Sequence, residues 1–259
     1  GTQHIVPDGE LRWMGARRTE NLLTYSEDLS NAAWIKSAAT VSSLGSGEFN
    51  LFDDATTAIH RTSGRAAKIV SGDTYTLSVE LKAGTKTWGL VQLASYTESH
   101  YVYVNLSTGE IGTGTSNTFA VSKDVGDGWW NISVRAVGTL SSSNITCAYI
   151  HLADGDLGVT YAGDGTGYIS VRSPQLENVT NQSIKTPADY VATTSAPAYK
   201  WFDTAQDGTP LRPIGTQSGV SMYDTYAPWK ASEGMYVGQR RKIDVNGKGM
   251  YIECTSPAL

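Results

Sequence analysis

The sequence predicts an all-β protein built on an antiparallel β-sandwich of the jelly-roll type. From about residue 38 to residue 177, short segments alternate between apolar and polar residues at fairly even spacing. Turn-forming sequences rich in glycine, serine and asparagine separate these segments. The composition agrees, because only 17% of the 259 residues are charged and serine, threonine and glycine supply much of the polarity.

The chain is predicted to have four parts. They are an N-terminal arm at residues 1–20, the sandwich at residues 21–177, a linker at residues 178–198 and a small β-rich appendage at residues 199–259. At the start of the sandwich, residues 26–31 are typical of a short capped helical turn that carries Trp34 into the core.

The clearest strand signal lies at residues 74–81, where every second side chain is large and apolar. Five further strands are predicted at residues 88–94, 101–106, 129–137, 145–152 and 168–176. Strict alternation in the last strand predicts one face with Ile169, Val171, Ser173 and Gln175, and the opposite face with Tyr168, Ser170, Arg172 and Leu176.

A glycine-rich turn precedes that last strand. Gly163, Gly165 and Gly167 can adopt positive φ angles, and Asp164 can hydrogen bond to the backbone of its own turn. The run therefore predicts a tight turn that feeds directly into the closing strand of the sandwich.

Charge and hydropathy exclude two classes of partner. The formal net charge is -5, and the longest basic cluster is Arg240-Arg241-Lys242, so no nucleic-acid surface is expected. No stretch approaches the roughly 18–20 apolar residues that span a bilayer, so no membrane insertion is expected. The two cysteines, Cys147 and Cys254, are expected to be unpaired, with a disulfide as the alternative.

Motifs of catalysis are missing from the sequence. Asp53 and Asp54 are adjacent, so in an extended chain they face opposite ways and make a poor catalytic pair. We expect these aspartates and Glu177 to be solvated carboxylates. The sequence has no zinc-binding His or Cys pair, no nucleophile elbow and no phosphate-binding loop, which predicts a protein that is not an enzyme.

The aromatic residues supply the positive signal for binding. The 14 tyrosines and 7 tryptophans far outnumber the 4 phenylalanines, and such side chains combine an apolar face with a polar tip. A glycan-binding platform is predicted at Trp88, Tyr96, Tyr101 and Tyr103. Tyr101 and Tyr103 are expected outside the core, because Val102, Val104 and Leu106 are the better core residues. The competing interpretation is that Trp34, Trp88 and Trp130 fill the core.

Calcium is the one candidate metal. Asp154, Asp156 and Asp164 lie in loops rich in oxygen ligands, although their spacing does not match a helix–loop–helix calcium motif. The competing interpretation is that all three are ordinary turn-forming aspartates.

Several segments, in this order, resemble a domain common in structural proteins of tailed-bacteriophage virions. They are NLLTYSEDLSNAAW at 21–34, YTLSVELKAG at 75–84, NLSTGEI at 105–111, GDGWWNISV at 126–134, YAGDGTGYISVRSPQLE at 161–177 and ADYVATT at 188–194. The resemblance covers roughly residues 20–195. One departure is Trp130-Asn131, where the family more often has an aromatic residue followed by arginine.

This resemblance implies a lectin-like or carbohydrate-binding-module-like jelly roll on a tail fibre, tailspike or head fibre, without a catalytic mechanism. The expected location is the virion, head or tail. The expected partners are other virion proteins, host-surface glycan and further copies of this chain, in a homo-oligomer and preferably a trimer. The alternatives are a carbohydrate-binding module from a polysaccharide-degrading enzyme and a capsule depolymerase.

Overall fold

The structure is a computed structural model of the chain. It describes residues 16–66, 69–94, 98–115, 119–137, 146–180, 182, 185–204, 210–213, 240–245 and 248–253. The chain forms two compact units, one of residues 20–198 and one that combines residues 1–19 with residues 199–259.

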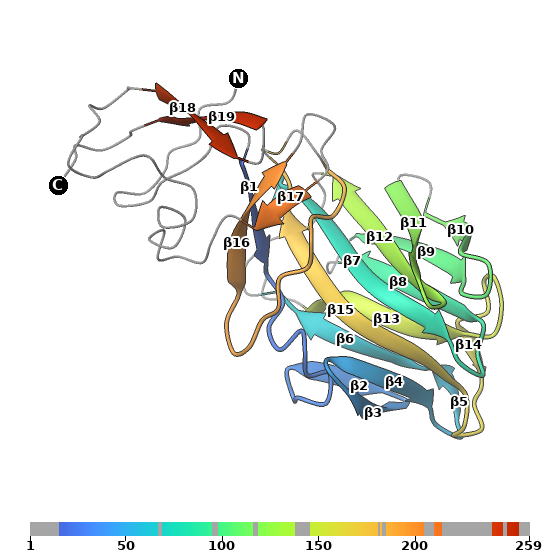
Figure 1. The fold of residues 1–259 in the computed structure, drawn as a ribbon. Helices are drawn as coiled ribbons and strands as arrows, with labels where there is room; N and C mark the ends of the chain where they lie inside the picture. The colour runs from blue at the N-terminus through green and yellow to red at the C-terminus, as the bar shows by residue number, and fades with distance from the viewer. Residues whose placement is uncertain are drawn as a thin grey trace. The chain divides into compact units, whose positions relative to one another are not determined.

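Residues 20–198 form a sandwich of two antiparallel six-stranded sheets (Figure 1). The first sheet has the order β10 (Glu110–Gly114), β9 (Ser99–Asn105), β8 (Trp88–Ala94), β13 (Thr146–Ala153), β6 (Arg61–Arg65) and β2 (Trp34–Ser37). The second has the order β11 (Phe119–Gly126), β12 (Trp129–Val137), β7 (Thr74–Ala83), β15 (Tyr168–Asn178), β4 (Glu48–Asp53) and β3 (Ala39–Gly45). A short pair, β5 (Thr57–Ile59) with β14 (Thr160–Ala162), completes this unit.

The predicted fold class is confirmed, because apolar side chains from both sheets pack into one shared core. The predicted alternation also holds in the central strands. On the core side lie Leu77, Val79 and Leu81 of β7, Ile132 and Val134 of β12, and Ala148, Ile150 and Leu152 of β13. Within the described residues the ordered elements of this unit are strands and turns.

The closing strand β15 departs from the predicted alternation. Ser173 has a φ of 54°, and the pairing with β7 shifts between Arg172 and Gln175. This bulge inserts an extra residue and inverts the order of the faces beyond it. Leu176 therefore joins Ile169 in the core, and Gln175 lies on the outer face. The face assignment from strict alternation is wrong beyond Arg172.

Part of the stretch with linker-like composition packs against the second sheet. The Val191 amide donates to Gln175 Oε1 at 2.7 Å, and the Ala188 amide donates to Glu177 Oε1 at 2.9 Å. Asn21 Nδ2 donates to the Val191 carbonyl at 2.9 Å. This segment therefore covers Gln175 and Glu177, which are buried, so the expectation of a solvated Glu177 is wrong.

Residues 26–31 form a series of turns in place of the predicted helical turn. The amides of Asp28, Asn31 and Trp34 each donate to the carbonyl three residues earlier. The expected outcome for Trp34 is confirmed, since its side chain is 1% exposed and lies in the core. Cys147 is also buried, as a free thiol whose pKa is raised by burial to about 12, whereas Cys254 lies outside the described residues.

The described residues of the other unit form strands. It contains a three-stranded sheet in the order β1 (Ala16–Asn21), β16 (Ala198–Thr204) and β17 (Pro210–Pro213). It also contains an antiparallel hairpin of β18 (Arg240–Val245) and β19 (Lys248–Glu253). In the described part of the chain, no helix is long and apolar enough to cross a membrane.

Candidate functional site

The candidate site lies on the outer face of the first sheet. Gln92 of β8 pairs directly with Tyr101 of β9 on one side and with Tyr149 of β13 on the other. Their neighbours along the strands, Val91 and Ile150, lie in the core, so these three side chains point away from it. Gln92, Tyr101 and Tyr149 are each partly exposed. Two aromatic side chains therefore flank one amide across three adjacent strands.

Hydrogen bonds hold the Gln92 amide in one orientation. His151 Nε2 lies 2.9 Å from Gln92 Oε1, and Gln92 Nε2 donates to Ser99 Oγ at 2.8 Å. Burial, together with the nearby Arg61 charge, lowers the pKa of His151 to about 3. The imidazole is therefore neutral at neutral pH, and Nε2–H donates to Gln92 Oε1. One amide hydrogen and one lone pair of Gln92 are left for a ligand.

Arg61 of β6 extends this face by one strand. Its guanidinium carbon lies 4.9 Å from the centroid of the Tyr149 ring, which is cation–π geometry. Arg61 also pairs in register with His151. We call Tyr101, Gln92, Tyr149 and Arg61 the outer-face row.

The structure brings three of the four predicted glycan-binding residues onto this same face. Tyr101 and Tyr103 meet edge to face with ring centroids 6.0 Å apart, and Trp88 packs beside them. Tyr103 is only 4% exposed, because Leu90 and the loop after β13 cover it. Tyr96 lies outside the described residues. The binding role of these residues stays a prediction.

Three members of the outer-face row were missed by the sequence analysis. The apolar set of Ala148, Ile150 and Leu152 already places Tyr149 on the opposite face of its strand. The same alternation around Val91 indicates that Gln92 faces outward. Nothing in the local pattern indicates that these strands are neighbours, and Arg61 had no signal beyond its charge.

The three predicted calcium ligands bind separate donors. Asp154 accepts from Lys86 Nζ at 2.7 Å, and Asp156 accepts from the amide and hydroxyl of Thr113, each at 2.9 Å. Asp164 accepts from the Thr166 amide at 2.7 Å. Among the described residues, no group of three or more His, Cys, Asp or Glu is placed to hold a metal ion. The aspartates act here as loop anchors.

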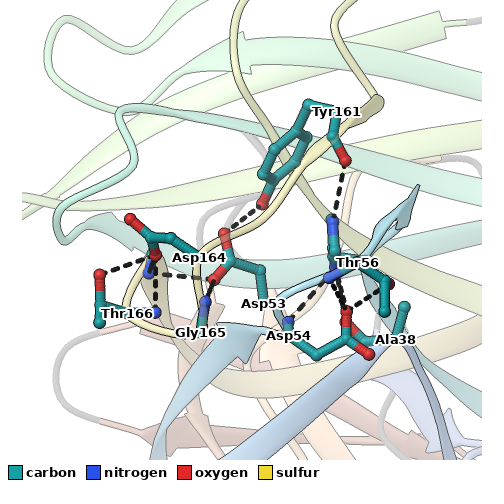
Figure 2. A network of polar contacts seen from close by, with 10 residues as sticks. Ala38, Asp53, Asp54, Thr56, Tyr161, Asp164, Gly165 and Thr166 are labelled. Carbon is teal, nitrogen blue, oxygen red and sulfur yellow. Dashed lines mark hydrogen bonds and ion pairs between the residues drawn. The ribbon is translucent and has the colours of Figure 1, made fainter.

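The glycine-rich turn wraps around a buried carboxylate (Figure 2). Asp53 Oδ1 accepts from the amides of Gly165 at 3.1 Å and Gly167 at 3.0 Å, and Asp53 Oδ2 accepts from the Tyr161 hydroxyl at 3.1 Å. Asp53 is 2% exposed, so the expectation of a solvated carboxylate is wrong for this residue. Burial and the Asp53 charge raise the pKa of Tyr161, which keeps its hydroxyl protonated as a donor.

The glycines of this turn serve two purposes. Gly165 has a φ of 80°, as the sequence predicted. Gly167 is required for space, because a Cβ there would lie 2.4 Å from Asp53 Oδ2. At Gly163 a Cβ would lie 2.0 Å from the Asp54 carbonyl oxygen. The motif therefore closes one end of the sandwich, where His60 also lies 3.2 Å from the Tyr161 carbonyl through Nε2.

Acidification is expected to destabilise the sandwich through His151. In the unfolded chain this histidine ionises near its ordinary pKa of 6.5, whereas in the folded protein the pKa is about 3. Between these values the unfolded chain binds a proton that the folded chain does not, so the free energy of unfolding falls as the pH falls below 6.5. One such group contributes up to about 1.4 kcal/mol per pH unit.

Urea denaturation at pH 7, 5.5 and 4.5 measures this effect. His151→Gln, which keeps a donor near Gln92, is expected to flatten the dependence on pH. His100, whose pKa is also lowered by burial, remains in that variant and serves as the internal reference. If the free energy of unfolding of His151→Gln fell with pH as steeply as that of the unaltered protein, the assignment of the pH dependence to His151 would be wrong.

These features define an all-β sandwich protein with an aromatic and amide-lined outer face. No protein-family model matches the chain, and no curated protein matches it by sequence. A solved structure that does match is the enzymatically active domain of tailspike protein 4 of bacteriophage CBA120. The match has a TM-score of 0.26 and 9% identity, and it covers 63% of this chain and 19% of the tailspike chain.

That match corrects one prediction. The lack of catalytic motifs predicted a protein that is not an enzyme, whereas the matching structure is described as enzymatically active. We therefore withdraw that expectation. A TM-score of 0.26 is too low for the match to assign a fold, an activity or a substrate to this chain.

Proposed function

We propose that this chain is a phage tail-associated virion protein whose sandwich binds carbohydrate on the host surface through the outer-face row. The observation that carries the proposal is the placement of Gln92 between Tyr101 and Tyr149, with its amide oriented by His151 and Ser99. Aromatic rings present flat apolar faces against which the C–H faces of sugars stack. A fixed amide between them can donate to one sugar hydroxyl and accept from another.

The phage context rests on the sequence resemblance over residues 20–195. On the same basis we propose that the chain assembles with other virion proteins as a closed oligomer, with three copies preferred. Size-exclusion chromatography with light scattering tests the oligomeric state, and a monomer would overturn that part of the proposal.

Removing the Tyr149 ring is expected to weaken carbohydrate binding about tenfold. Loss of one stacking partner costs about 1–2 kcal/mol, and Tyr149→Ala also removes the surface on which Arg61 rests. The protein is first applied to an array of bacterial surface glycans, and the affinity for the best ligand is then measured by calorimetry. Gln92→Ala is expected to lower the affinity for the same ligand by a similar factor, since it removes both hydrogen-bonding groups of the amide.

Phe119→Ala is the matched control for Tyr149→Ala. Phe119 is an aromatic residue on β11 of the second sheet, and it is 57% exposed. Its removal is expected to leave glycan affinity unchanged. Binding that survives both Tyr149→Ala and Gln92→Ala, in variants with unchanged thermal unfolding, would place the carbohydrate site elsewhere.

A further inference from the structure

On the outer face of the first sheet, the charged side chains of β6 are positive, and the negative charge of Glu110 and Asp156 lies toward the opposite edge, at β10. The chain as a whole is acidic, with 25 Asp and Glu against 20 Lys and Arg. In the described strands β9, β8, β13, β6 and β2, however, none of the outward positions is Asp or Glu. Arg61 and Arg65 both occupy outward positions of β6, with Ser63 between them. The β6 edge of this face is therefore locally positive, although the chain as a whole is acidic.

Arg61 has no carboxylate partner among the described residues. The structure pairs Arg172 with Glu48 and Glu80, and Lys86 with Asp154. Arg61 instead contacts the face of the Tyr149 ring. A guanidinium that lies on an aromatic ring keeps its N–H edge available for a planar, bidentate anion such as a carboxylate.

The neighbouring histidine adds no positive charge at neutral pH, because burial lowers the pKa of His151 to about 3. His151 pairs in register with Arg61, and its Nδ1 is buried without a hydrogen-bond partner. The positive charge of the site is therefore concentrated at the arginines of β6.

We propose that the outer-face row binds an acidic polysaccharide, with Arg61 holding a sugar carboxylate beside the Tyr149 and Tyr101 platform. Arg65 lies four residues further along the same strand, about 13 Å away at strand spacing. Two cations along one strand match a polymer with repeated carboxylates better than a single acidic sugar. This inference rests on the proposed carbohydrate-binding function and names its ligand class.

The test compares polymers that differ only in charge. Polygalacturonate, alginate and hyaluronan are each titrated into the 259-residue chain, alongside the same polymers after chemical reduction of their carboxyl groups. At least one native polymer is expected to bind at least ten times more tightly than its reduced form. Arg61→Gln is expected to weaken binding of that native polymer about tenfold, and so to reduce the difference in affinity between the native polymer and its reduced form.

Lys123→Gln is the charge-matched control. Lys123 is exposed on β11 of the second sheet, and its replacement changes the net charge by the same amount. It is expected to leave the affinity unchanged. Equal losses in Arg61→Gln and Lys123→Gln would show unspecific attraction and overturn the inference.

The other outcomes separate the inference from the proposed function. Equal binding of native and reduced polymers, weakened in both cases by Tyr149→Ala, would overturn the acidic ligand class and leave carbohydrate binding intact. Binding of neutral glycans on the array, with no binding of any native polyuronate, would also overturn the acidic ligand class and leave carbohydrate binding intact. Absence of binding both to the polymers and to the array would overturn both.

Discussion

Replacing Asp53 with alanine is expected to lower the free energy of unfolding by about 3–5 kcal/mol. The carboxylate is buried and accepts three hydrogen bonds, from the amides of Gly165 and Gly167 and from the Tyr161 hydroxyl. Alanine leaves all three donors without this partner, and each unsatisfied buried donor costs about 1–3 kcal/mol. The lost hydrogen bonds hold the turn that positions β15, and β15 pairs with both β4 and β7.

The adjacent aspartate is the control for this experiment. Asp54 has a side chain that is 39% exposed, and its carboxylate bonds to Thr56 in the same loop. Asp54→Ala is therefore expected to cost less than about 1 kcal/mol. The free energy of unfolding of Asp53→Asn should lie between those of the two alanine variants, because Oδ1 can still accept hydrogen bonds from both glycine amides. Urea denaturation followed by tryptophan fluorescence compares the variants, and equal losses at positions 53 and 54 would contradict the structural role of Asp53.

Trp34→Ala is expected to destabilise the sandwich by about 3–5 kcal/mol. The indole lies in the core, and its Nε1 donates to the Tyr25 carbonyl at 2.9 Å. It also packs closely on Gly64 of the neighbouring strand, where a Cβ would lie 2.8 Å from the ring. Truncation leaves a cavity beside a glycine, which has no side chain to fill it, so the cost should be near the upper end for aromatic residues.

Two further variants make this result specific. Trp34→Phe keeps most of the apolar volume and loses the hydrogen bond to Tyr25, so a smaller loss of about 1–2 kcal/mol is expected. Phe119→Ala removes an exposed ring on an edge strand and should change stability by less than about 0.5 kcal/mol. The midpoint of thermal unfolding ranks the three, and a Trp34→Ala midpoint equal to that of Phe119→Ala would contradict the core assignment.

The strands themselves were largely predictable from the sequence. The predicted strands at residues 88–94 and 129–137 coincide with β8 and β12, and β7 and β13 differ from their predictions by one or two residues. The reason is physical, since successive side chains of a strand face opposite ways and one face of each sheet must be buried. Alternating apolar residues therefore mark both the strand and its core side.

The errors have a common cause in backbone irregularity and in contacts between distant segments. The bulge at Ser173 inverts the faces of β15, and nothing in the local pattern of hydrophobicity indicates it. Asp53 looked like a loop carboxylate because the amides that bind it come from residues more than 100 positions later in the chain. Local patterns carry no information about such partners.

The residues of the candidate site were likewise predictable only in part. Aromatic composition pointed to Trp88, Tyr101 and Tyr103, which do share a face, although Tyr103 is covered by the loop after β13. The row of Tyr101, Gln92 and Tyr149 depends on β13 lying next to β8, and these strands are more than 50 residues apart in the chain. Sequence order does not reveal that adjacency.

The amino-acid sequence alone therefore determined the fold class, most of the strands and which of their side chains enter the core, because each of these follows from the period of a single extended segment. Only the tertiary structure decided which strands are neighbours, where β15 bulges, and which polar groups meet. Those features depend on hydrogen bonds and packing between segments distant in sequence. The orientation of Gln92 and the burial of Asp53 are two examples.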